Sequence, residues 1–87
     1  MNNQQILEEL IELLEKAGVE VRQEPLDGGG GLCTIKGKTI LFADTHSSSV
    51  QNAALCARAL TENTDIETIY IKPEIRQFIE KSTGKDS

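Results

Sequence analysis

The start of the chain carries apolar side chains at helical spacing, with glutamates between them. This pattern is typical of an amphipathic helix and predicts one over residues 4–17. Gly18 follows, at a position where glycine commonly ends a helix. The apolar stripe is wide enough to contact two layers, or a core and a partner, and contact with the core is the expected role. It consists of Ile6, Leu7, Leu10, Ile11, Leu13, Leu14 and Ala17.

The next segments alternate apolar and polar residues, as half-buried strands do. Residues 19–24 predict one strand, and residues 32–36 and 39–43 predict a hairpin that turns at Gly37. The second hairpin strand is apolar on both faces, so we expect it to lie at the centre of the sheet. The glycine run 28–31 predicts a flexible connection before the hairpin.

A second helix is predicted over residues 49–61. Ser48 and Gln51 have the spacing of a capping box at its start. The segment is rich in alanine and apolar around most of its circumference, which predicts a deeply buried, central helix. Asn63 is placed to act as a left-handed cap at its end.

The last part of the chain predicts a strand over residues 66–71, which alternates again. Pro73 suits the first turn of a third helix that runs to about Lys81. We therefore expect an α+β fold in the order α-β-β-β-α-β-α, with a small, mostly antiparallel sheet of three to four strands. The expected organisation is a single domain over residues 1–82 and a flexible polar tail over residues 83–87.

Composition narrows the class of protein. With 87 residues, 38% of them apolar, the chain suits one small domain. A formal net charge of −5 disfavours nucleic-acid and membrane partners, because phosphates and anionic lipids repel such a surface. The N-terminal string MNNQQILEEL lacks a basic region and carries acids within its apolar stretch, so it predicts neither a signal peptide nor a membrane span. The expected location is the cytoplasm.

One near-motif for nucleotide binding can be rejected. Gly31 and the string Gly37-Lys38-Thr39 enclose five residues, where a phosphate-binding loop has four. A strand follows Lys38, whereas the phosphate loop needs a helix whose N-terminal amides face the phosphates. No catalytic residues and no cofactor are predicted, and the protein is not expected to be an enzyme.

The connector after the hairpin holds the polar residues most suited to binding a ligand, Asp44, His46 and Ser48. Asp, His and Ser are also the residue types of a hydrolytic triad. Triads are assembled in space from separate elements, however, so closeness in sequence is not an argument for one. Turns and helix caps explain the same residues equally well.

A metal site would need three or four ligands. Cys33, His46 and Cys56, with a carboxylate such as Asp44, form the only plausible set. This set requires Cys33 on its strand to face the same cavity as Cys56 on the helix. The alternative is that the cysteines are small core residues, reduced in the cytoplasm.

Two stretches resemble known families. The strings GGLCTIKGKTILFADTHSSSVQNAALCARALTEN and ETIYIKPEIRQFIEK resemble small uncharacterised bacterial proteins, a likeness that implies no function. The hairpin and following helix are more distantly similar to metallopeptidase domains of the ImmA/IrrE type. Those domains carry HExxH on that helix, with two histidines for zinc and a glutamate as base. Residues 54–60 read ALCARAL here, so this likeness implies an inactive scaffold.

Two functions follow as hypotheses. The first is a non-catalytic protein-interaction module that acts as a homodimer or as a subunit of a complex. It rests on the small size, the wide apolar stripe of residues 4–17 and the exposed edge expected of strand 66–71. The alternative is a small-ligand or metal-binding protein that uses the Asp44–His46 loop with Cys33 and Cys56.

Overall fold

The computed structural model describes residues 1–26 and 30–84. Within these ranges the elements follow the order α-β-β-β-α-α, which confirms the α+β class. Of the segments expected to be flexible, residues 28–29 and 85–87 lie outside the described residues, whereas Gly31 begins a strand and Thr83 ends a helix. The helices are α1 (Asn3–Lys16), α2 (Ser49–Asn63) and α3 (Pro73–Thr83), and the strands are β1 (Glu20–Glu24), β2 (Gly31–Ile35) and β3 (Lys38–Asp44).

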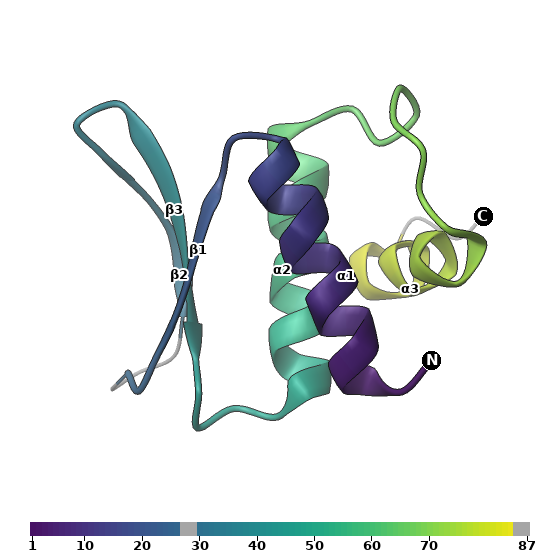
Figure 1. Ribbon diagram of the computed structural model, residues 1–87, viewed down its shortest axis with the longest axis horizontal. Helices are drawn as coiled ribbons and strands as arrows, with labels where there is room; N and C mark the ends of the chain where they lie inside the picture. Colours follow the sequence, from purple (N-terminus) through teal and green to yellow (C-terminus); the bar gives the residue numbers. More distant parts are fainter. Residues whose placement is uncertain (27–29, 85–87) are drawn as a thin grey trace.

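The elements form three layers. Figure 1 shows the sheet on one side of the pair α1 and α2, with α3 on the other side of that pair. Helix α2 contacts α1, β3 and α3, so it is the central helix, as its alanine-rich sequence predicts. Its start has the predicted capping box, in which the Ser48 hydroxyl accepts from the Gln51 backbone N–H at 3.2 Å.

Strand β3 lies between β1 and β2, which confirms its predicted central position. The sheet is mixed, however, and the prediction of a mostly antiparallel sheet is wrong. β2 and β3 form an antiparallel hairpin, whereas β1 and β3 are parallel. The chain reverses between β1 and β2, and again at Lys36 and Gly37, whose positive φ angles of 51° and 77° suit a two-residue hairpin turn. Two reversals leave β1 and β3 pointing the same way.

The predicted strand 66–71 is absent, because a turn takes its first half. The Asp65 carboxylate accepts the backbone N–H of Glu67 at 3.0 Å, and the Asp65 carbonyl accepts that of Thr68 at 3.0 Å. Asx turns of this kind compete with strand pairing for backbone groups. Arg76 on α3 then donates to the Ile66 carbonyl at 2.9 Å. The order is therefore α-β-β-β-α-α, and the apolar residues of this segment pack on the core as irregular chain.

The core lies between the sheet, α1 and α2, and between these helices and α3. The wide stripe of α1 is used within the protein, because its central leucines are buried and Ile6, Ile11 and Leu13 pack at the rim of the core. The fully buried large side chains are Leu10, Leu14, Leu41, Cys56, Leu60, Ile75 and Ile79. No helix in the described ranges is long and apolar enough to cross a membrane.

The helix ends differ in how well the sequence predicts them. Gly18, with φ of 90°, ends α1 as predicted and lets the Val19 N–H donate to the Leu14 carbonyl at 2.9 Å. Asn63 is not a left-handed cap, which corrects the prediction. It stays in the last turn of α2, where its side-chain amide donates to the Ala59 carbonyl at 2.8 Å, and Thr64 follows in an extended conformation.

Candidate functional site

Asp44 lies at the end of β3 and joins three segments. Its carboxylate oxygen Oδ1 accepts the backbone N–H of His46 at 2.9 Å and that of Leu26 at 3.1 Å. Its carbonyl accepts the side-chain amide of the buried Asn52, on α2, at 2.9 Å. These contacts hold the entry to α2 against the end of β1. Asp44 therefore has a structural role at the position where the sequence predicts a ligand.

We expect the free energy of unfolding to fall at acid pH, because Asp44 becomes protonated there. The His46 N–H, and secondly the Leu26 N–H, lower the pKa of the folded carboxyl. A carboxyl in the unfolded chain titrates near pH 4, at about 3.9. The stabilisation is therefore complete above about pH 4 and is lost as the pH falls through the lower pKa of the folded state.

Urea unfolding of the wild type and of Asp44→Asn, from about pH 2 to about pH 7, measures this effect. The amide keeps an acceptor oxygen and cannot titrate in this range. The difference in free energy of unfolding between the two proteins should be constant near neutrality and shrink below about pH 4. A difference that stays the same over the whole range would contradict the role given to Asp44.

The two other residues predicted in this loop do not converge on a ligand. The His46 ring is 73% exposed, and its Nδ1 lies 3.6 Å from the Asp44 oxygen that the backbone already occupies. The Ser48 hydroxyl caps α2 through the N–H of Gln51. A ligand-binding role for this loop therefore stays a prediction.

The predicted metal ligands are not brought together. Cys33 is exposed on the face of β2 turned away from the helices, whereas Cys56 is buried in the core on α2. In the part of the chain that the structure describes, no three His, Cys, Asp or Glu side chains form a group that could hold a metal ion. The two thiols therefore do not face one cavity, which was the condition for the site.

The two thiols are expected to react very differently. Burial raises the pKa of the Cys56 thiol to about 12, so it carries almost no thiolate near neutral pH, while Cys33 is open to solvent. A maleimide should label only Cys33 in the native protein, and both cysteines in urea. Mass spectrometry of the labelled peptides checks this, with Cys33→Ser as the control that should leave the native protein unlabelled. Equal labelling of both cysteines under native conditions would contradict the burial.

The most unusual surface is the side of the sheet that faces away from α1 and α2. No described helix covers it (Figure 1), and the described chain at Leu26 reaches only its end, where the Leu26 N–H donates to Asp44. Side chains alternate along a strand, and Leu41 and its β1 neighbour Val21 point to the helices. Their neighbours in sequence therefore point outward. We call this set the outer sheet face; it consists of Glu20, Arg22, Glu24, Gly31, Cys33, Ile35, Lys38, Ile40, Phe42 and Asp44.

The part of the outer sheet face on β2 and β3 is apolar. Ile35 is 48% exposed, Cys33 is exposed, and Phe42 is half-buried. An open hollow beside Phe42 is lined by Cys33 and by the chain at Leu26, Gly30 and Gly31. Apolar side chains gathered on one uncovered face are typical of a surface that binds another molecule. The sequence does indicate apolar strand faces, since alternation groups Cys33 with Ile35 and Ile40 with Phe42. It does not indicate which side of the sheet the helices cover.

The part of this face on β1 is charged. Glu20 forms ion pairs with Arg22, Nε to Oε2 at 2.6 Å, and with Lys38, Nζ to Oε1 at 3.0 Å. Glu20 is the β1 neighbour of Ile40, which is only 5% exposed. The hydrogen bonds from Arg22 and Lys38 lower the pKa of Glu20. The face thus combines an apolar strip on two strands with a charged strip on the third.

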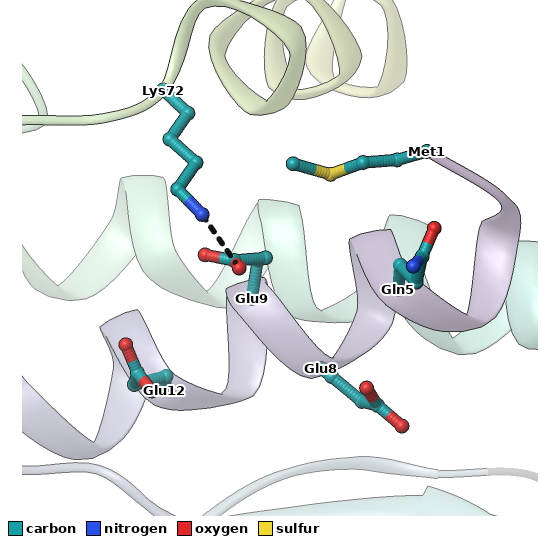
Figure 2. Close-up of a pocket in the computed structure, with 6 residues that line it drawn as sticks. All are labelled: Met1, Gln5, Glu8, Glu9, Glu12 and Lys72. Atoms are coloured by element: carbon teal, nitrogen blue, oxygen red, sulfur yellow. Dashed lines mark hydrogen bonds and ion pairs between the residues drawn. The ribbon is translucent and has the colours of Figure 1, made fainter.

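A separate surface groove lies between α1 and the start of α3. Figure 2 shows Lys72 reaching from the segment before α3 to Glu9 on α1, with Nζ 2.9 Å from Oε2 and with the Met1 side chain nearby. The other acids on the wall of the groove pair within their own helix, Glu12 with Lys16 at 3.6 Å and Glu8 with Gln4 at 3.2 Å. An ion pair between two elements crosses the groove, and the described acids on its wall all have partners within the chain.

Comparisons of this chain with protein-family models, with curated proteins and with solved structures found no match. The two resemblances noted from the sequence therefore stay predictions, and functional inference rests on the geometry of the surfaces.

Proposed function

We propose that the protein is a non-catalytic interaction module that binds a protein partner through the outer sheet face. The observation that supports this proposal is the apolar strip of Cys33, Ile35 and Phe42, which no described helix covers. A sheet packed on one side only usually presents polar residues to water on its other side. Here the central and hairpin strands present apolar side chains there, and a partner would remove them from water.

The two edges of the sheet differ in a way that also favours a partner on one side. β1 carries Glu20, Arg22 and Glu24 along its length, and charges on an edge strand hinder pairing with another chain. β2 carries no charged side chain along its length, from Gly31 to Ile35. A partner is therefore best placed over β2 and β3. This position replaces the two surfaces expected from sequence, because the stripe of α1 is used in the core and residues 66–71 form no strand.

The test compares two variants of a tagged protein. Ile35→Glu places a charge in the apolar strip. Tyr70→Glu is the matched control, because Tyr70 is 80% exposed and lies in the segment between α2 and α3, outside the strands of the sheet. Both sites are open to water, so both variants should fold, as far-UV circular dichroism can verify. Proteins that co-elute from a cell extract, including an untagged second copy of this chain, are quantified by mass spectrometry.

The proposal expects a stoichiometric protein partner that is lost with Ile35→Glu and kept with Tyr70→Glu. A partner that binds both variants equally would contradict the assigned face. An eluate that holds only the tagged chain, together with a monomeric protein in solution, would contradict the function itself.

A further inference from the structure

The outward side chains of β3 have a self-complementary order of charge. Along the strand they are Lys38, Ile40, Phe42 and Asp44, so a positive end and a negative end enclose two apolar residues. If the same column of a second copy faces this one and runs in the opposite direction, each cation lies opposite an anion and each apolar residue lies opposite another. The middle of the column lies at Leu41, whose own side chain points to the helices.

On β1, the pair Glu20 and Arg22 has the same property about the same point, and Glu24 lies beyond that pair. Glu20 lies beside Ile40 and Arg22 lies beside Phe42 in the parallel register. End-to-end reversal about Leu41 therefore places Glu20 opposite Arg22 of a second copy, and Arg22 opposite its Glu20. By the same reversal, Cys33 on β2 lies opposite Gly31 of the second copy, and neither residue is charged.

We propose that the outer sheet face packs against the same face of a second copy of this chain, about a two-fold axis that crosses the strands at Leu41. This inference rests on the proposed function and names its partner. The two sheets lie face to face about 10 Å apart, as in a β-sandwich. The contacts of this dimer are Glu20 with Arg22, Lys38 with the edge of Asp44, whose side chain is 10% exposed, and Phe42 with the surface over Ile40, which is 5% exposed. Each contact is made twice because a two-fold interface repeats every contact.

Charge elsewhere in the protein favours this face over the others for a second copy. The charged residues of the strands and the hairpin turn sum to zero, since Glu20, Glu24 and Asp44 balance Arg22, Lys36 and Lys38, whereas the whole chain has a net charge of −5. The excess of acid includes the exposed Glu8, Glu12 and Glu15 of α1, across the sheet from the proposed interface. Two copies joined through their sheets therefore keep their acidic helices apart.

The alternative two-fold axis, parallel to the strands, is disfavoured by the same pattern. It would lay β1 of one copy over β2 of the other, and so place the charges of Glu20 and Arg22 against Cys33 and Ile35. Burying those charges against apolar groups costs free energy, because no partner replaces the water they lose. The intrachain pairs of Glu20 do not prevent the favoured arrangement, since exposed ion pairs hold their partners weakly.

The size of the face sets the expected strength of the dimer. Three strands and the seven residues of β3 span roughly 14 Å by 23 Å at standard strand spacing and rise. This is well below the ~800 Å² that each partner buries in an interface of standard size. We therefore expect a reversible dimer with a dissociation constant in the micromolar range.

The decisive experiment uses two charge reversals, alone and mixed. Glu20→Arg gives a copy with two positive side chains at these positions, and Arg22→Glu gives a copy with two negative ones. Each variant should dimerise at least about tenfold more weakly than the wild type, because like charges then face each other twice. An equimolar mixture should dimerise like the wild type, since every facing pair is again opposite in charge. Sedimentation velocity over a concentration series measures all four samples.

The outcomes separate this inference from the function on which it rests. A wild type that stays monomeric at several hundred micromolar overturns the dimer, and a mixture no stronger than its components overturns the two-fold arrangement. If either result occurs while Ile35→Glu still abolishes binding of a different protein, the interaction module stands and only its partner is wrong. If no partner binds at all, both proposals fail.

A second measurement uses the native thiol in the face. The two-fold places the Cα atoms of Cys33 in the two copies roughly 12 Å apart, from the sheet separation and a two-residue offset along the strands. A bismaleimide with a spacer of that length should join two copies of the wild type, and Cys33→Ser should give no product because Cys56 is buried. Absence of a cross-linked product at concentrations where sedimentation detects a dimer would overturn the assigned face.

Discussion

Leu41→Ala is expected to lower the free energy of unfolding by about 3 kcal/mol, the scale found for leucines truncated in well-packed cores. Leu41 is the fully buried side chain that the central strand directs at the helices, where it belongs to the cluster formed with α1 and α2. Truncation removes apolar contacts and leaves a cavity that the surrounding core closes only in part. An 87-residue domain has a total stability of about 4 to 13 kcal/mol, so the loss is a large part of the whole.

Urea unfolding followed by far-UV circular dichroism measures this change. The matched control is Ile35→Ala in the neighbouring strand, which removes a branched side chain from a position that is 48% exposed. Its effect on monomer stability should stay within about 0.5 kcal/mol, as is usual for surface positions. Equal losses for the two variants would mean that the sheet does not bury its helix-facing side as described. The comparison is made at low protein concentration, so that self-association does not contribute.

Gly30→Ala is expected to destabilise the protein by about 2 kcal/mol or more, because a side chain there has no space. A Cβ at Gly30 would overlap the Phe42 carbonyl oxygen in the middle of β3, and would lie 3.1 Å from Leu55 Cδ2 on α2. The carbonyl belongs to the central strand and cannot move without disturbing its pairing, so β2 itself must shift. The smallest possible side chain is therefore enough to open the sheet at this edge.

Gly31→Ala is the control, and the adjacent position should behave in the opposite way. A Cβ at Gly31 has no atom within 4 Å, and its backbone does not have the positive φ that favours glycine. Alanine at such a site reduces the freedom of the unfolded chain and typically adds about 0.4 to 1 kcal/mol of stability. Thermal unfolding of both variants gives the comparison. If Gly30→Ala were as stable as Gly31→Ala, the close approach of Gly30 to β3 would be disproved.

The hydrophobic pattern predicts the elements better than their arrangement. The spacing of Leu7, Leu10 and Leu14 predicts α1, and the two apolar faces of β3 predict its central place, because burial alone decides both features. The direction of β1 is different. Alternation tells which side of a strand is buried, but a parallel and an antiparallel neighbour can bury the same residues. The sheet is therefore mixed, although the sequence predicts antiparallel pairing.

Residues 66–71 show how a local interaction can override a pattern. The alternation of Ile66, Ile69 and Ile71 is that of a strand, yet the Asp65 side chain fixes a turn over the first of these positions. Side-chain hydrogen bonds of this kind do not appear in a hydrophobic pattern, although an Asp before an apolar run is a signal for one.

The candidate site was predicted least well. The polar residues that looked reactive, Asp44 and Ser48, are explained by a turn and a helix cap. The outer sheet face was not predicted, because the pattern shows that β3 is apolar on both sides but not that α1 and α2 pack on the same side. That choice depends on how the two helices fit each other, which is a property of the assembled chain.

The central place of β3 also has a consequence during synthesis on the ribosome. β1 and β2 both precede β3 in the chain and pair only with it, never with each other. A nascent chain can therefore form no part of this sheet until β3 has emerged, and α2, which covers it, comes later still. During that interval β1 and β2 expose unpaired backbone N–H and C=O groups, and unpaired strands of this kind are prone to aggregation. The charges along β1 and Pro25, which follows it, are features that hinder the pairing of an exposed strand with another chain.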